Sequence, residues 1–200
     1  MATRQTDINE KMRAILVDWL IDVHLKFKLL PETLFLTINL IDRYLEQVDV
    51  NRVKLQLVGV TAMLIACKFE EVQWPYVRDF VYITDKAYSR EEIIKMEYSM
   101  LLVLDYNICA PSSFRFLERY AKVVNANMFQ FNFARYCIEL PLIEYRMLKY
   151  SPSTQAVSAV YLAMGLAFEE ADGDQKEAGS SSSNWAEQLF HYSGYTEDVI

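Results

Sequence analysis

The chain has 200 residues, of which 52% are hydrophobic and 24% charged, and its formal net charge is −7. Such a composition is typical of globular proteins, and the length allows one large domain or two small ones. The excess of acidic residues argues against a nucleic-acid-binding surface, which needs clustered Lys and Arg, and against an anionic membrane as partner. The longest nearly uncharged apolar run, residues 55–67, is too short to span a bilayer.

The first half of the chain predicts five helices. Glycine and proline are scarce and no stretch alternates as a strand does, so the predicted fold class is all-α. Asp7 or Asn9 can cap the first helix, Pro31 suits the first turn of the second, and Ser89 with Glu92 forms a capping box before the fifth. The third is rich in small residues and apolar nearly all round, which predicts a buried central helix. The expected helices cover about residues 9–28, 31–47, 53–71, 75–83 and 90–106.

The second half repeats this order of helices. Ser112 or Ser113 can cap a helix over about 114–124, a long helix is expected over about 129–148 with Pro141 as a kink or an early break, and Pro152 opens another small, apolar helix. A short helix near 184–194 precedes a last one, which is expected to be cut short at residue 200. We therefore predict domains at 1–110 and 111–200, with a flexible insertion at about 169–184.

No residue pattern indicates catalysis. Neither histidine has Cys or carboxylate at metal-ligand spacing, and the chain has no Gly-rich phosphate loop and no nucleophile elbow. We therefore expect no metal, no cofactor and no enzymatic activity. The odd number of cysteines, in apolar contexts, predicts reduced, buried thiols of a cytosolic or nuclear protein. They are Cys67, Cys109 and Cys137.

The first helix has two apolar faces, because successive residues turn by about 100°. One face carries Met12, Ile15, Leu16 and Trp19, and roughly opposite lie Ala14, Val17, Ile21 and Leu25. Either both faces belong to the core, or one is partly exposed and forms an apolar groove. Lys68 and Glu97 also have two interpretations, as charges on solvated helix surfaces or as members of a binding site.

Several ordered stretches resemble the cyclin family, its mitotic A/B type in particular. They are MRAILVDWL, ETLFLTINLIDRYL, KLQLVGVTAMLIACKFEE, VYITDKAYSREEIIKME and LLVLDYNICAPSSFRFL. The resemblance implies two five-helix cyclin boxes, the second truncated in its last helix. It also implies a nuclear and cytoplasmic regulatory subunit that binds and activates a cyclin-dependent kinase at G2/M. The alternative is a cyclin-box transcription adaptor that touches DNA, for which basic stripes would be needed.

The resemblance also implies two sets of site residues. The set expected to face the kinase comprises the charged pair Lys68 and Glu97, the apolar Phe69, Leu101, Tyr106 and Ile108, and the acids Glu70 and Glu71. The set expected to dock substrates or inhibitors carrying an Arg-x-Leu motif comprises Met12, Ile15, Leu16, Trp19, Asp22 and Gln56. Trp74 and Tyr76 depart from the family, which usually has a proline and a glutamate there.

Overall fold

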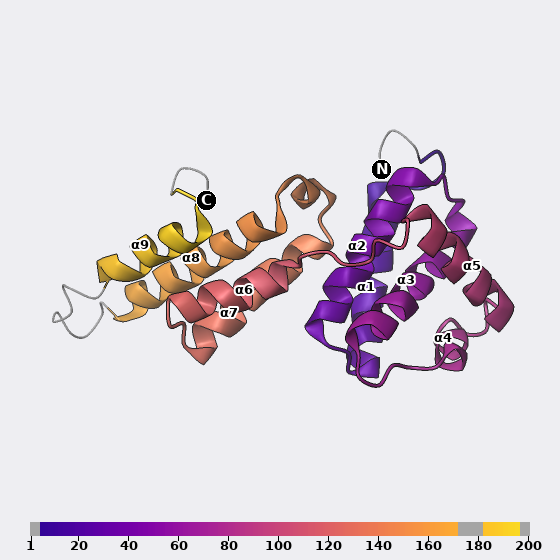
Figure 1. The fold of residues 1–200 in the computed structure, drawn as a ribbon, viewed down its shortest axis with the longest axis horizontal. Coiled ribbons are helices and arrows are strands. Elements are labelled where there is room, and N and C mark those ends of the chain that lie inside the picture. The colour runs from indigo at the N-terminus through magenta and orange to yellow at the C-terminus, as the bar shows by residue number, and fades with distance from the viewer. Residues whose placement is uncertain (1–4, 172–181, 197–200) are drawn as a thin grey trace. The chain divides into compact units, whose positions relative to one another are not determined.

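The computed structural model describes residues 5–171 and 182–196, and every regular element in these two ranges is helical. The expected all-α class is therefore confirmed. The chain divides into two compact units, Met1–Ala110 and Pro111–Ile200. Figure 1 shows each unit as a bundle of helices. No helix in the described ranges is long and apolar enough to cross a membrane.

In the first unit, helix α3 lies between the other helices (Figure 1). Its residues from Leu57 to Cys67 are all buried, and it contacts each of the other four helices. This burial explains why its sequence is apolar nearly all round. The helices of the unit are α1 (Glu10–Phe27), α2 (Pro31–Gln47), α3 (Leu55–Glu70), α4 (Val77–Ile83) and α5 (Arg90–Val103), with a short 3-10 helix η1 (Arg52–Lys54).

The helix ends in this unit follow local sequence signals. The Asn9 side chain accepts a hydrogen bond from the Met12 backbone N–H at 3.0 Å, and α2 begins at Pro31. Ser89 and Glu92 form the expected reciprocal capping box at the start of α5. These caps satisfy backbone N–H groups that the first turn of a helix cannot pair internally.

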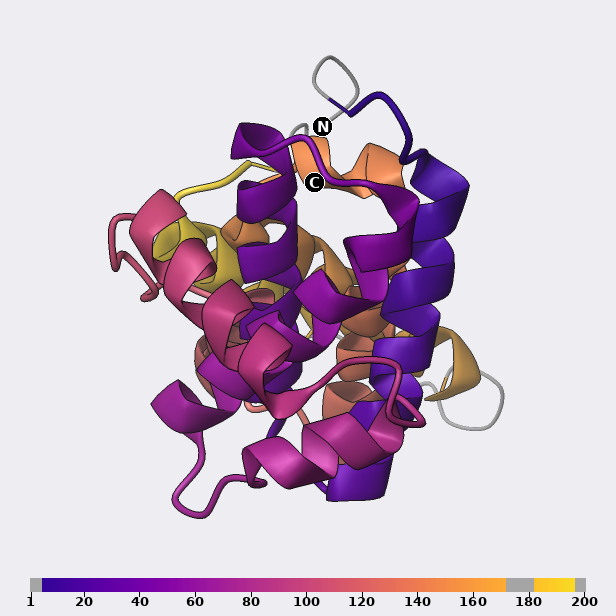
Figure 2. The same ribbon diagram turned by 90° about the vertical axis from the view of Figure 1, so that its right-hand side faces the viewer.

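A buried ion pair fixes α1 against α2. The Arg13 side chain is fully buried, and its Nε and Nη2 atoms donate to Asp42 Oδ1 and Oδ2 at 2.6 and 2.7 Å. A buried charge is tolerated only when it is paired and hydrogen-bonded, and the two-point contact meets that need. The pair thereby holds the orientation of α1, which runs along one side of the unit in Figure 2.

Helix α1 also approaches α3 closely. A Cβ atom added to Gly59 would lie 2.8 Å from Leu16 Cδ1, which is closer than real Cβ contacts allow. Leu16 is buried at 6% exposure, so the missing side chain of Gly59 makes room for it. The absence of a side chain at Gly59 therefore allows α1 and α3 to pack closely at Leu16.

The second unit is built around α8. Helix α8 contacts each of the other helices of this unit, and Tyr161 on α8 stacks with Phe190 and lies at a tilted angle to Trp185. Ser112 caps the first helix by accepting from Arg115 N at 3.3 Å. The elements are α6 (Ser113–Val123), α7 (Met128–Glu139), η2 (Leu140–Leu142), η3 (Tyr145–Lys149), α8 (Pro152–Ala171) and α9 (Ser182–Ser193).

The structure decides two expectations of the sequence analysis, and two others concern segments at the end of the second unit. The long helix over 129–148 breaks at Glu139, because Pro141 has no N–H to continue the helical hydrogen bonds. The ends of the insertion expected at about 169–184 are helical, because α8 continues to Ala171 and α9 begins at Ser182. Its residues 172–181, and residues 197–200 of the expected last helix, lie outside the described residues. Cys67 is buried and Cys137 half-buried, as expected, but Cys109, in the non-helical segment after α5, is exposed.

Candidate functional site

Lys68 and Glu97 are brought together although 29 residues separate them in the chain. Lys68 lies in the last turn of α3 and Glu97 in the middle of α5. Lys68 Nζ is 2.6 Å from Glu97 Oε1, and the two side chains keep 40% and 14% of their surface exposed. A half-exposed pair of this kind stabilises a fold by no more than about 1 kcal/mol. The pair therefore contributes little to stability, and both side chains remain within reach of a partner at the surface.

Large apolar side chains are exposed at the end of α3 and in the turn that follows α5. Phe69 follows Lys68 on α3 and is 50% exposed, while Tyr106 lies in the turn after α5 and is 58% exposed. Leu101 and Ile108 are half-buried and pack against the core of the unit. Tyr106 is held by its backbone N–H, which donates to the Leu101 carbonyl at 2.9 Å. The expected apolar residues therefore include two that the core does not cover and two that it partly covers.

Helix α5 exposes three further apolar side chains that sequence reasoning missed. Ile94 is 36% exposed, Tyr98 62% and Leu102 49%. They follow one another at intervals of four residues and therefore lie on the same side of the helix. That spacing was the available signal, but it is equally typical of residues that face a core.

The two acids after Phe69 differ in their surroundings. Glu70 is half-buried at the end of α3. Glu71 Oε1 accepts hydrogen bonds from the Leu30 backbone N–H at 2.7 Å and from Thr33 Oγ1 at 2.6 Å. It thereby caps α2, which has no side-chain cap of its own, and places a carboxylate at the positive end of that helix. Glu71 thus has a role within the unit, whatever it contacts elsewhere.

The two faces proposed for α1 are not equivalent. The buried stripe of α1 runs between them through Arg13, Leu16, Val17 and Leu20. On the first face Ile15 is 61% exposed, and Met12 and Trp19 are half-buried at the edge of the core. Leu16 lies beneath them as part of the core. On the opposite face Val17 is buried but Leu25 is 64% exposed.

The two polar residues of the expected docking set lie on different helices. Asp22 is exposed three residues after Trp19, a spacing that places both on one side of the helix. Gln56 is half-buried at the start of α3, the helix that packs against α1. An apolar patch with a carboxylate at one end is suited to a short peptide that carries both an apolar and a cationic side chain.

The described residues contain no group of three or more His, Cys, Asp or Glu side chains that could hold a metal ion. Burial raises the pKa of the Cys67 thiol to about 12, and the nearby Glu71 carboxylate adds to this effect. Cys67 is therefore protonated at neutral pH and unsuited to act as a nucleophile.

Comparison with protein families identifies both units. Residues 1–109 match the family described as "Cyclin, N-terminal domain", and residues 111–200 match "Cyclin, C-terminal domain". The chain belongs to the cyclin family. Its two compact units are tandem cyclin domains.

Its relatives include mitotic cyclins of animals and plants. The chain is 48% identical over 196 residues to a G2/mitotic-specific cyclin-B of Hydra viridissima, covering 98% of this cyclin and 47% of that one. It is 53% identical over 160 residues to Cyclin-B2-1 of Arabidopsis thaliana, covering 80% of this cyclin and 37% of the relative. The chain thus spans about half or less of the length of these curated relatives.

Solved structures share the fold. A viral cyclin from herpesvirus saimiri superposes with a TM-score of 0.80 at 21% identity, covering 98% of this cyclin and 82% of the viral chain. A chain of the CAK complex of Chaetomium thermophilum, bound to ATP-gamma-S, superposes with a TM-score of 0.62 at 16% identity, covering 95% and 64%. These likenesses support the cyclin fold for the whole chain.

Proposed function

We propose that this cyclin is a non-catalytic regulatory subunit that binds and activates a cyclin-dependent kinase during G2/M progression, in the nucleus and cytoplasm. Its cyclin boxes would be residues 1–110 and 111–200. The observation that carries the proposal is the Lys68–Glu97 ion pair, which joins α3 to α5; the exposed Phe69 follows Lys68 in the chain. The names of the mitotic relatives support the G2/M assignment.

The ion pair is suited to hold main-chain groups of a partner. A lysine ammonium has three donors and a carboxylate two acceptor oxygens, so each side chain keeps hydrogen-bonding capacity after forming the pair. Covering these charges in an interface costs free energy unless new partners replace water. Backbone carbonyl and N–H groups of the kinase's regulatory helix would supply those partners, and Phe69, Leu101, Tyr106 and Ile108 would cover its apolar side.

Activation would then be a shift between kinase conformations. The cyclin binds the state whose regulatory helix is turned inward and whose activation loop is open, and it stabilises that state by the difference in affinity. Moving a kinase from almost all inactive to almost all active needs a difference of about 5.5 kcal/mol. Several apolar side chains together with the charged pair can supply this amount. Glu70 and Glu71 would lie near the activation loop, although Glu71 already accepts two hydrogen bonds from α2 and the residue before it.

The exposed side of α1 is proposed to dock substrates or inhibitors that carry an Arg-x-Leu motif. The leucine would enter the patch formed by Met12, Ile15 and Trp19, over the floor made by Leu16. The arginine would meet the Asp22 carboxylate, and Gln56 would offer its amide to the peptide backbone.

The test is a titration of the chain into a purified monomeric cyclin-dependent kinase, with phosphorylation of two peptides that differ in a distal Arg-x-Leu motif. We expect activation with better use of the motif peptide. The variant Lys68→Ala/Glu97→Ala should lower the phosphorylation of both peptides by the kinase. The control Lys95→Ala/Glu91→Ala, on the exposed surface of α5, should leave it unchanged. Unchanged activation by Lys68→Ala/Glu97→Ala would overturn the proposed interface.

The docking patch is tested separately in the same assay. Ile15→Ser changes an exposed side chain and should abolish the preference for the motif peptide without changing activation. Leu25→Ser is the matched control, because Leu25 is equally exposed on another side of α1. A preference that survives Ile15→Ser and Trp19→Ala would return these residues to a purely structural role.

A further inference from the structure

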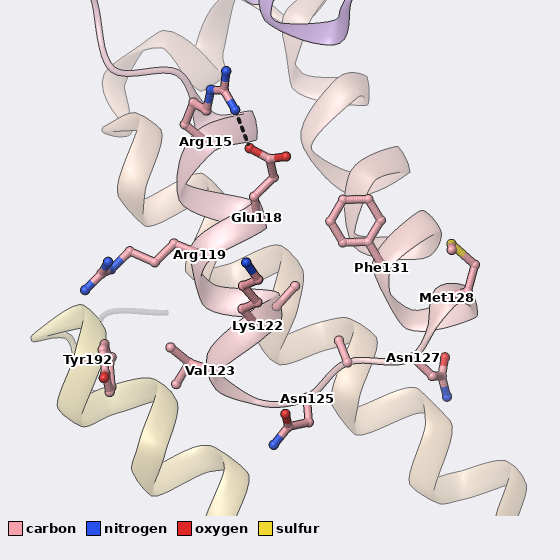
Figure 3. A pocket seen from close by; sticks show the side chains of 12 residues that line it. Arg115, Glu118, Arg119, Lys122, Val123, Asn125, Asn127, Met128, Phe131 and Tyr192 are labelled. Atoms are coloured by element: carbon pink, nitrogen blue, oxygen red, sulfur yellow. Dashed lines mark hydrogen bonds and ion pairs between the residues drawn. The ribbon is translucent and has the colours of Figure 1, made fainter.

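The second unit carries an open groove of about 1180 Å³ that the kinase and Arg-x-Leu sites do not use. Figure 3 shows its lining, which comes from α6, the turn after α6, the start of α7, and Tyr192 on α9. None of these elements carries a residue of either proposed site.

The groove is cationic, although the chain as a whole is acidic. Arg115, Arg119 and Lys122 follow one another along one side of α6 at helical spacing. The one acidic residue in the lining, Glu118, is paired with Arg115, with 2.9 Å between its Oε2 and Arg115 Nη1. The Arg119 guanidinium lies 5.5 Å from the centre of the Tyr192 ring, which orients it. Arg119 and Lys122 are both exposed, so a ligand can reach their charges.

Apolar side chains border the same groove. Phe131 is half-buried, and Met128, at the start of α7, is 73% exposed. Exposed methionine and aromatic side chains are enriched where proteins bind peptides. The groove therefore combines exposed cations with an apolar border.

The first unit has the same turn between its first two helices, which allows the two units to be compared. Lys28 ends α1 with φ 55°, and Asn125 follows α6 with φ 52°. In both turns the next backbone N–H donates to the carbonyl five residues earlier, and the next helix begins three residues after the left-handed residue. The corners at the ends of α1 and α6 are thus equivalent in backbone structure.

At two aligned positions the equivalent first helices carry opposite charges. When the two turns are aligned, Arg115 and Arg119 of α6 correspond to Asp18 and Asp22 of α1, and Lys122 corresponds to an apolar residue. The exposed side of α1 is therefore suited to a cationic peptide, and that of α6 to an anionic one. Electrostatic complementarity of this kind sets which partner binds and how fast it associates.

We propose that this groove binds an acidic peptide segment of a partner protein. Carboxylates of the segment pair with Arg119 and Lys122, and an apolar side chain of the segment packs against Met128 and Phe131. The site operates whether or not the chain activates a kinase, so the two proposals can fail separately.

The test measures binding of a short fluorescein-labelled peptide, with glutamates on both sides of a leucine, to the whole chain by fluorescence anisotropy. The matched probe has glutamine in place of every glutamate. We expect the glutamate peptide to bind about tenfold or more tightly than the glutamine peptide, with an affinity that falls as salt is raised. Equal binding of the two peptides, or no binding of either, would overturn the proposal.

Variants locate the site. Arg119→Glu/Lys122→Glu should weaken binding of the glutamate peptide about tenfold or more, while Lys95→Glu/Lys149→Glu changes the net charge equally and should leave it within about twofold. Met128→Ser should weaken binding severalfold, and Lys122→Gln checks the charge effect without a repulsive group. Thermal unfolding confirms that each variant is folded. If both charge-reversal variants lose affinity equally, the effect is one of net charge and the proposal is wrong.

Sedimentation addresses the competing occupant, a second copy of this acidic chain. We expect the chain to remain monomeric at the concentrations of the binding assay. A dimer that dissociates on Arg119→Glu/Lys122→Glu would assign the groove to self-association and overturn the peptide proposal.

Discussion

Helices α1 and α6 open their respective units, yet their side chains are distributed differently. Helix α6 buries one stripe, formed by Phe114, Leu117, Tyr120 and Ala121, and its fully exposed residues are the charged Arg115, Arg119 and Lys122. Helix α1 buries a stripe that begins with a charged residue, Arg13, and leaves Ile15 and Leu25 exposed on either side of it. A helix with one stripe offers solvent a charged surface, whereas a helix with apolar residues around that stripe offers an apolar one. The contrast gives the two units surfaces of different character on helices that occupy equivalent positions.

The helices that follow these two, α2 and α7, are capped in different ways. In the first unit the Glu71 carboxylate, from the end of α3, caps α2 through Leu30 and Thr33. In the second unit α7 is capped from within, by a reciprocal box of Asn127 and Gln130. A cap supplied by the helix's own sequence needs no side chain from the central helix.

The largest expected effect breaks the buried ion pair that distinguishes α1. Arg13→Ala leaves Asp42 without its bidentate partner, and removing one member of a buried pair typically costs about 3–5 kcal/mol. Urea unfolding should show this loss in the free energy of unfolding. The matched variant is Arg115→Ala, which removes the exposed ion pair of α6 and should cost no more than about 1 kcal/mol. Equal losses for the two variants would show that the burial of Arg13 has no energetic consequence.

A smaller effect compares the central helices α3 and α8. Gly59→Ala places a methyl group 2.8 Å from Leu16 Cδ1, so the α1–α3 contact must shift at a cost of about 1–3 kcal/mol. Gly165→Ala on α8 meets nothing within 4 Å and should stabilise by about 0.4–1 kcal/mol through the lower entropy of the unfolded chain. Thermal unfolding of the two variants distinguishes these signs. If Gly59→Ala leaves the unfolding temperature unchanged, α1 and α3 are not tightly packed at Gly59.

The smallest expected effect concerns thiol reactivity and its pH dependence. Burial raises the pKa of Cys67 to about 12 from 9.0, so the folded state binds the thiol proton more tightly than the unfolded state does. Stability from this group is complete below pH 9.0 and is lost as pH rises toward about 12. Iodoacetamide at pH 8 should therefore modify the exposed Cys109 well before Cys67, as peptide mass spectrometry can follow. Rapid alkylation of Cys67 would show that the end of α3 opens readily.

Features with local causes were predictable from the chain itself. The Ser89–Glu92 box, the start of α2 at Pro31 and the buried character of α3 each depend on residues close together in sequence. The effect of Pro141 was predicted only as a choice between a kink and a break. The structure shows a break, with α7 ending at Glu139 and a 3-10 helix following it.

Features that join distant residues were not predictable in the same way. The Arg13–Asp42 pair spans 29 residues and was missed, although Arg13 stands in helical register with Leu16, Val17 and Leu20. Its position at the head of an apolar stripe was the available signal. The bonds from Leu30 and Thr33 to Glu71 span 41 and 38 residues, and no sequence pattern indicates them.

By itself the sequence determined the all-α class, the repeat of helices, most helix ends and, through its family motifs, the residues proposed to face a kinase. These depend on periodicity, caps and short motifs, which act over a few residues. Only the tertiary structure decided that Lys68 forms an ion pair with Glu97, that Leu16 is buried while Ile15 is exposed, and that the groove beside α6 is open to solvent. Each of those outcomes depends on which helices pack together, and packing is a property of the whole unit and not of any one segment.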